Sequence, residues 1–197
     1  MLNKKHPFIC LKFLLAVGLW FFFTACKQPI KTQEALNQYI SDPHNNLQQT
    51  QETNGVKVTL TYKPWQAFIR GTSNKANIKK YSNRYFFVLS LSAHDKELLR
   101  QLDFDTYSNM VQVLSFRMIP LIHAIPDNGK PVEPMDCIFQ QTYGTATANN
   151  LLIVFDKDKL LFNKKLNIVI NEFGLNLGTL QFQFNANDFK EIPDINI

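Results

Sequence analysis

Residues 56–63 read Val-Lys-Val-Thr-Leu-Thr-Tyr-Lys, and this stretch decides the fold class. Apolar side chains stand at every second position, and lysine or threonine fills the positions between them. Successive side chains of a β-strand point to opposite faces, so this period of two predicts a strand with one buried face and one face in water. Gly55 precedes the stretch and Pro64 ends it, as expected for a strand between two turns.

Similar patterns recur towards the C-terminal end of the chain. We expect further strands over residues 85–91, 137–143, 151–155, 166–171 and 180–184. The run at 85–91 begins apolar on both faces, which is typical of a strand in the middle of a sheet. Residues 107–124 change parity, so they predict either a helix that gives way to a strand or a bulged strand. Residues 173–178 predict a hairpin between the last two strands.

About seven short strands without a βαβ alternation predict a mainly β protein, a single antiparallel β-sandwich. A small closed β-barrel is the alternative. We expect residues 1–25 to be a leader, residues 26–54 a tether with a short helix over 32–40, and residues 55–197 the sandwich domain. The polar stretch 48–54 predicts a spacer between domain and membrane, although part of it could dock on the fold.

The leader has a basic start and a short apolar block. Three lysines precede or adjoin the block at residues 13–25, and Cys26 follows it at once. A membrane-spanning helix needs about 20 apolar residues, and this block has 13. The length therefore predicts a secretory signal peptide rather than a transmembrane anchor. Ala25 suits cleavage by the general signal peptidase, whereas the bulky Phe23 does not.

The four residues Phe23-Thr-Ala-Cys26 resemble the signal of bacterial lipoproteins, whose pattern is Leu, two small residues and then Cys. Ala25 and Cys26 match this pattern, Thr24 is tolerated, and Phe23 departs from the usual Leu. The resemblance implies that residues 1–25 are removed and that Cys26 is lipidated, which anchors the protein in the cell envelope. Lys27 stands where an Asp would signal retention in the inner membrane, which implies the outer membrane of a Gram-negative bacterium.

The charge of the mature chain is close to balanced. Three of the 21 Lys and Arg residues lie in the leader, so the mature part has 18 bases against 16 acids. Nucleic-acid binding needs a concentrated positive face, so this balance argues against a nucleic-acid partner. One basic cluster remains, formed by Lys75, Lys79, Lys80 and Arg84. It predicts a solvated loop over residues 71–83 or, alternatively, a contact with acidic lipid headgroups or sugars.

Motifs that carry chemistry are missing from the sequence. It has no dinucleotide or phosphate loop, no H-E-x-x-H, no C-x-x-C and no G-x-S-x-G. With Cys10 expected to leave with the leader and Cys26 expected to be lipidated, Cys137 has no disulfide partner. We therefore expect Cys137 to be a buried, inert thiol. We expect no catalytic residue, no metal and no cofactor. We expect ordinary surface or packing roles for the remaining acid–base candidates. These are His44, His94, His123 and the pairs Asp103 with Asp105 and Asp156 with Asp158.

Three aromatic side chains, Tyr62, Trp65 and Phe68, cluster around Pro64. They predict core packing, or a binding surface for a sugar or a partner if they are exposed together. We therefore expect a lipid-anchored envelope protein without enzymatic activity, which binds another envelope protein as a subunit or accessory factor. Its layout resembles the small sandwich lipoproteins that fasten envelope-spanning secretion machines to the outer membrane, although no residue carries over. The alternatives are a carbohydrate- or small-ligand-binding lipoprotein and a hydrolase with a dispersed site on His94 or His123.

Overall fold

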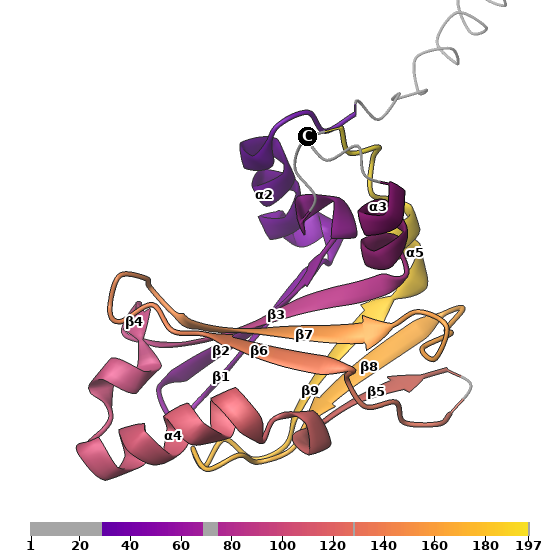
Figure 1. The fold of residues 1–197 in the computed structure, drawn as a ribbon. Coiled ribbons are helices and arrows are strands. Elements are labelled where there is room, and N and C mark those ends of the chain that lie inside the picture. Colours follow the sequence, from indigo (N-terminus) through magenta and orange to yellow (C-terminus); the bar gives the residue numbers. More distant parts are fainter. Residues whose placement is uncertain (1–28, 69–74, 128, 197) are drawn as a thin grey trace, which may run out of the picture.

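The computed structural model describes residues 29–68, 75–127 and 129–196, which form two antiparallel β-sheets (Figure 1). The larger sheet has the strand order β1-β2-β3-β7-β6, with β4 paired to β3. Its strands are β1 Gln48–Thr53, β2 Val56–Lys63, β3 Arg84–Ala93, β4 Lys96–Glu97, β6 Asp136–Gln140 and β7 Asn149–Asp156. The smaller sheet has the order β5-β8-β9, with β5 Ile122–Pro126, β8 Lys165–Ile170 and β9 Leu180–Asn185.

This arrangement confirms the mainly β sandwich. The described residues contain nine strands rather than about seven, and neither sheet closes into a barrel there. The leader and Cys26 lie outside the described residues. The α-helices in the described ranges are α2 Gln33–Ser41, α3 Lys75–Ser82, α4 Phe104–Phe116 and α5 Ala186–Lys190. Single 3-10 turns are η2 Pro43–Asn45, η3 Trp65–Phe68, η4 Leu98–Gln101 and η5 Ile119–Leu121.

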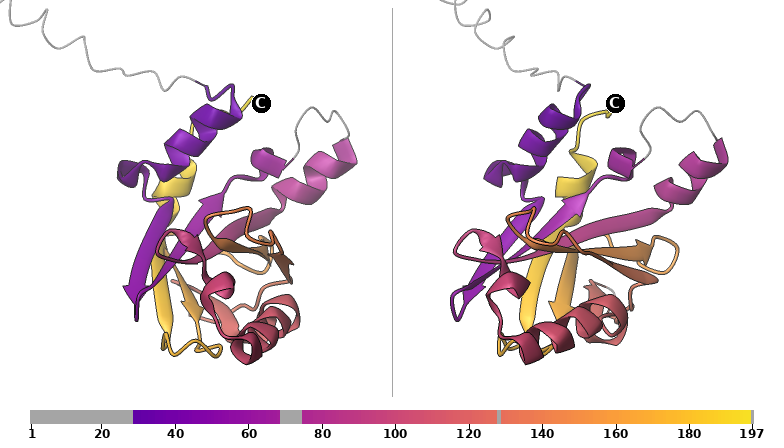
Figure 2. Two further views of the ribbon diagram at one scale, coloured as in Figure 1. Left: turned by 90° about the vertical axis from the view of Figure 1, so that its left-hand side faces the viewer. Right: turned by 60° about the vertical axis from the view of Figure 1, so that its left-hand side comes forward.

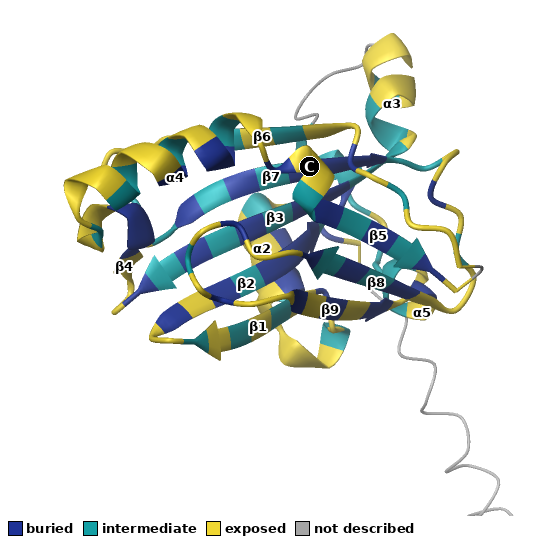
Figure 3. Cartoon of the chain, turned by 90° about the horizontal axis from the view of Figure 1, so that it is seen from below, coloured by how far each residue is buried: buried dark blue, intermediate teal, exposed yellow. Residues whose placement is uncertain are grey.

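The core lies between the two sheets. Alternation in β2 and β3 turns Val58, Leu60 and Leu89 inwards, where they are fully buried. The fully buried ring of Phe87 lies 5.3 Å, centroid to centroid, from the ring of Phe184 on the smaller sheet. Figure 3 shows that buried residues follow the strands of both sheets and that α4 keeps one exposed side. No helix within the described ranges is long and apolar enough to cross a membrane.

The folded unit begins earlier than the sequence predicted. Residues 48–54 do not form a free spacer, because β1 pairs along its whole length with β2. Leu36 and Ile40 of α2 and the following Leu47 are buried in the core, so the predicted short helix docks on the sandwich. Ile30 forms a parallel bridge with Ile195 close to the C-terminus. The domain therefore extends from residue 30 rather than from residue 55.

Two glutamines of β1 connect the edges of the two sheets. The Gln49 amide donates to the carbonyl oxygen of Gln183 on β9, and the Gln49 Oε1 accepts the N–H of Gln183 at 3.1 Å. The Gln51 amide donates to the carbonyl oxygen of Gln181 on the same strand. These contacts of Gln49 and Gln51 with the backbone of β9, which we call the glutamine bridge, join the sheets at the β1 edge. At the opposite edge of the larger sheet, β6 has only β7 as a strand neighbour among the described residues.

A helix replaces most of the predicted loop at 71–83. Residues 75–82 form α3, which has no buried residue. Asp103 and Asp105, for which we expected ordinary surface or packing roles, lie at the start of α4. The Asp103 carboxylate caps that helix by accepting the N–H groups of Asp105 at 3.1 Å and Thr106 at 3.0 Å. The parity change over residues 107–124 is thus a helix followed by a strand, the first of the two predicted alternatives.

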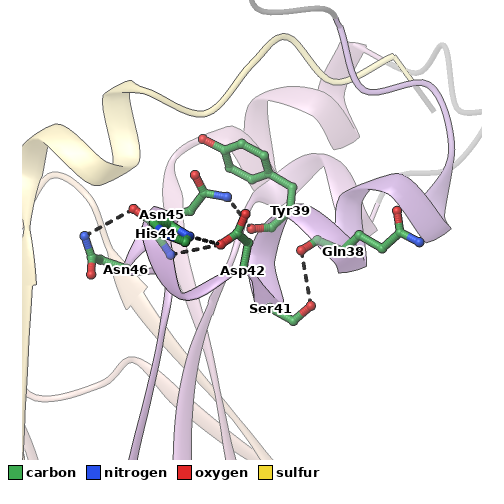
Figure 4. Close-up of polar contacts among 7 residues, drawn as sticks. All are labelled: Gln38, Tyr39, Ser41, Asp42, His44, Asn45 and Asn46. Carbon is green, nitrogen blue, oxygen red and sulfur yellow. Dashed lines mark hydrogen bonds and ion pairs between the residues drawn. The ribbon is translucent and has the colours of Figure 1, made fainter.

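One end of the molecule collects both ends of the described chain. The N-terminal segment enters beside the C-terminal residues, and α2, α3 and α5 lie at this end, whereas α4 lies at the other (Figures 1 and 2). The turn after α2 is held by Asp42, whose carboxylate accepts the backbone N–H of His44 at 3.0 Å and lies 2.9 Å from its Nδ1 (Figure 4). The hydrogen bond from the His44 backbone is the main reason why the pKa of Asp42 is lowered.

Candidate functional site

The outer face of the larger sheet divides into an apolar and a polar half. Side chains of the parity opposite to the core point outwards, and the strand register aligns them in rows across the sheet. The apolar row consists of Val88, Leu152 and Ile138, and the polar row beside it of Thr59, Ser90, Asn150 and Gln140. The apolar row ends at β6, the edge strand of this sheet.

A groove of about 380 Å³ lies over the apolar row. Its lining consists of Phe68, Val88, Ile138, Phe139, Gln140, Asn150 and Leu152. Ile138 is 49% exposed, which is unusual for a β-branched apolar side chain in the centre of a strand. We call this feature the outer groove.

The wall of the outer groove is built by η3, which follows directly after Pro64 ends β2. The ring of Phe68 lies 4.5 Å from the ring of Phe86, and the ring of Tyr81 on α3 lies 5.9 Å from that same ring. Phe86 is thereby buried although it points away from the main core. Ile138, at the β6 end of the apolar row, stays half-exposed among the described residues.

The predicted basic cluster forms a second hollow at the neighbouring corner. This open pocket of about 670 Å³ is lined by Ala76, Lys79, Lys80, Ser82, Asn83, Arg84, Met135, Asp156 and Asp158. Lys75 lies one helical turn before Lys79 on α3. None of the four predicted cations forms an ion pair within the described part of the chain, where His44 with Asp42 is the pair found.

The two acids in this pocket are engaged in their own turn. The Asp158 carboxylate accepts the side-chain amide of Asn83 at 2.8 Å, and the Asp156 carboxylate accepts the N–H of Asp158 at 2.8 Å. The Lys157 Nζ donates to the carbonyl oxygen of Ser82 at 2.6 Å and so fixes the end of α3. The pair Asp156 and Asp158 therefore lies in a surface turn, as predicted.

The predicted aromatic cluster is split by the structure. Tyr62 points into the core, where its ring stacks on Phe189 at 4.2 Å, and burial raises the pKa of its hydroxyl. Tyr62 therefore cannot contact a ligand on the surface. Trp65 is half-buried in η3, and Phe68 alone of the three lines the outer groove. Tyr62 continues the inward series of β2, whereas Trp65 and Phe68 lie in η3, beyond the end of that strand.

The two histidines proposed for a dispersed active site, His94 and His123, are positioned by different sheets. His94 is exposed in the turn after β3, with its Nδ1 3.0 Å from the Oε1 of Gln101, whereas His123 lies on β5 of the other sheet. Within the described ranges no group of three or more His, Cys, Asp or Glu side chains is arranged to hold a metal ion. Cys137 is half-buried on β6, and burial raises its pKa to about 12, which keeps the thiol protonated.

One buried carboxylate holds a loop rather than a ligand. Glu97 is 2% exposed and accepts the hydroxyl of Thr142 and the N–H groups of Gly144 at 2.7 Å and Ala146 at 3.1 Å. Burial by itself would raise the pKa of Glu97, but these hydrogen bonds and the nearby charge of Arg100 outweigh burial and lower the pKa. Glu97 therefore anchors the loop that follows β6.

Sequence reasoning missed the residues that make the outer groove apolar, above all Val88, Leu152 and Ile138. A signal was present in residues 85–91, whose start is apolar on both faces and so implies that something apolar lies outside the sheet. The groove itself depends on the register of β3, β7 and β6, which only the structure supplies.

The fold and this site define a two-sheet antiparallel β-sandwich with an apolar surface groove at a sheet edge. No protein-family model matches the chain, and no curated protein matches it. A solved structure of a DUF4426 family protein from Pseudomonas aeruginosa PAO1 aligns with 71% of this chain and 93% of that chain, at 13% identity and a TM-score of 0.37. A TM-score this low supports no argument about the function of the chain.

Proposed function

We propose that the protein is a lipid-anchored cell-envelope protein that binds an extended segment of a partner protein in the outer groove. The observation that carries this proposal is the apolar row of Val88, Leu152 and Ile138, which lines the outer groove and ends at the edge strand β6 with Ile138 49% exposed. An exposed apolar patch that is bordered by polar residues is typical of protein–protein contact sites. The envelope location is supported by the leader sequence and by Cys26 at its end.

The edge strand explains why the partner segment would be extended. Alternate N–H and C=O groups of an edge strand point away from its neighbour and can pair with an added strand. A segment paired with β6 would place the residue opposite Ile138 on the outer face, next in the apolar row. An apolar side chain at that position would therefore be selected. The residues two positions away on the segment would face Asp136 and Gln140, which favours polar or basic side chains there.

Ile138 gives the size of the expected effect. Burying an isoleucine completely contributes about 1.5–3 kcal/mol, and about half of this remains available because Ile138 is 49% exposed. About 1 kcal/mol corresponds to a roughly fivefold change in affinity. Ile138→Glu would cost more, since it would also bury a charge, and we expect a loss of at least about tenfold.

A photo-crosslinking amino acid at position 138 in cells tests the groove, with the same amino acid at Leu161 as the control. Leu161 is also apolar and is 64% exposed, but it lies outside the groove. We expect one stoichiometric partner from position 138 alone, with the crosslink mapped to an apolar residue in an extended segment. Equal capture from both positions, or no stoichiometric partner, would refute the proposed binding role. Capture of a glycan instead would favour the carbohydrate alternative.

The anchor is tested separately with Cys26→Ser. We expect this variant to remain unprocessed or to leave the membrane fraction, whereas Cys137→Ser should fractionate as the wild type does. The matched cysteine control excludes a general effect of losing a thiol. Normal maturation and normal membrane fractionation of Cys26→Ser would show that the lipid anchor is wrong, whatever the outcome at position 138.

A further inference from the structure

The end of the molecule that carries α3 combines two features that the outer groove does not use. The chain enters the described domain there, and three residues separate Cys26 from Ile30, the first buried residue in the described ranges. A fully extended chain spans at most about 3.6 Å per residue, so a lipid on Cys26 would keep Ile30 within about 15 Å of the bilayer surface. A domain held on so short a connection must present this end to the membrane.

The charges at this end are divided between two corners. The helix α3 carries Lys75, Lys79 and Lys80 and no acidic residue, and all three lysines are exposed. Beside α3 the acids are Asp156 and Asp158, which are held in their own turn. The other corner has more acids than bases, since Glu34, Asp42, Asp188, Glu191 and Asp194 lie there with Lys31 and Lys190. An anionic surface would therefore attract the α3 corner and repel the opposite corner, which sets the tilt of the domain.

Further observations show that α3 is built as a projection rather than as part of the core. It has no buried residue, and Figures 2 and 3 show it standing away from the sheets. Among the described residues, its C-terminal end is held where Tyr81 packs on Phe86 and the Lys157 Nζ donates to the carbonyl oxygen of Ser82, and the helix also contacts η3. Its lysines make no ion pair within the described residues, so their charge is available to an external partner.

We infer that α3 is a membrane-contacting helix whose lysines bind the anionic headgroups of the bilayer that holds the lipid on Cys26. This inference rests on the anchor in the proposed function, but not on the partner in the outer groove. Each lysine near an anionic membrane contributes roughly 1 kcal/mol, so three lysines strengthen binding by at most on the order of 100-fold. The contact orients the domain, because it brings the end that carries α2, α3 and α5 to the bilayer and leaves α4 at the far end (Figure 1).

The test uses the full mature lipoprotein in a Cys137→Ser background, reconstituted into phosphatidylcholine vesicles with or without 30% phosphatidylglycerol. A fluorophore is attached at Asn77→Cys on α3 or at Phe116→Cys at the opposite end of the molecule, and iodide quenching reports its exposure to water. We expect the label at position 77 to be shielded in anionic vesicles only, and to become accessible in 1 M salt, where the Debye length is about 3 Å. The label at position 116 should stay accessible throughout.

Matched charge reversals identify the residues involved. Lys79→Glu with Lys80→Glu should abolish the shielding, whereas Lys57→Glu with Lys96→Glu should leave it intact. Lys57 and Lys96 are exposed at the far end of β3 from α3, since they face or pair with Ser92 and Ala93. A label at position 77 that is equally accessible in both vesicles, or equal loss in both double variants, would overturn the inference. Mass spectrometry of the N-terminal peptide distinguishes this result from failure of the anchor, in which no lipid is found on Cys26.

Discussion

The glutamine bridge predicts a specific loss of stability when its two side chains are removed. Gln49→Ala with Gln51→Ala deletes three hydrogen bonds to the backbone of β9. A hydrogen bond contributes about 0.5–1.5 kcal/mol net, and these glutamines are half-exposed, so water replaces part of what is lost. We therefore expect the double variant to lose about 2 kcal/mol of unfolding free energy, which lowers the Tm by about 4–8 °C for a domain of this size.

Urea denaturation followed by circular dichroism measures this change, with Gln112→Ala as the matched control. Gln112 is an exposed glutamine on α4, and we expect its removal to change stability by less than about 0.5 kcal/mol. Amide hydrogen exchange gives a residue-specific readout, because the N–H of Gln183 donates to Gln49 and should lose protection in the variant. Wild-type stability together with unchanged exchange at Gln183 would refute the role of the bridge in joining the sheets.

Three further predictions concern the core and two buried groups. Phe87→Ala should cost about 3–5 kcal/mol in urea denaturation because its buried ring contacts both sheets, whereas Phe116→Ala, at an 84% exposed position, should change stability by less than about 0.5 kcal/mol. The pKa of Glu97 is lowered in the folded state, so its ionised carboxylate stabilises the fold at neutral pH, and this contribution is lost as the pH falls through the folded pKa. The Glu97→Gln variant should therefore lose less stability in acid than the wild type does. An unchanged curve of unfolding free energy against pH would contradict this. Because burial raises the pKa of Cys137 to about 12, a thiol reagent at pH 8 should modify it only after unfolding, and immediate reaction of the folded protein would contradict this.

Two patterns in the sequence predicted strands. Alternation indicated β2, β8 and β9, which bury one face against the other sheet, and apolar runs indicated β3 and β7. β1 gives no such signal because it is polar on both parities. Its outward residues face water, and its inward-parity glutamines bind backbone groups of β9 instead of packing in the core. Its pairing is decided by the neighbouring edges of two sheets, which no local pattern encodes.

The same reasoning explains what was missed at the surface. The helix α3 buries no residue, so it lacks the apolar stripe by which a helix is recognised in a sequence. The basic cluster could be named from the sequence, yet its position at the end where the chain enters could not. The outer groove required three strands to be in register, and two of them, β3 and β7, are far apart in the sequence. The aromatic cluster around Pro64 was visible, but the division of Tyr62 from Phe68 between core and groove was not.

The bridge between Ile30 and Ile195 has a consequence for how the protein is made. Backbone hydrogen bonds join the two segments at 2.7 Å from Ile30 to Asp194 and at 2.9 Å from Asn196 to Ile30. A chain that is synthesised from its N-terminus can therefore form these hydrogen bonds of Ile30 only after residues 194–196 have been made. Docking of the Ile30 segment completes the domain, so a product that stops short of residue 194 would leave it exposed to proteases.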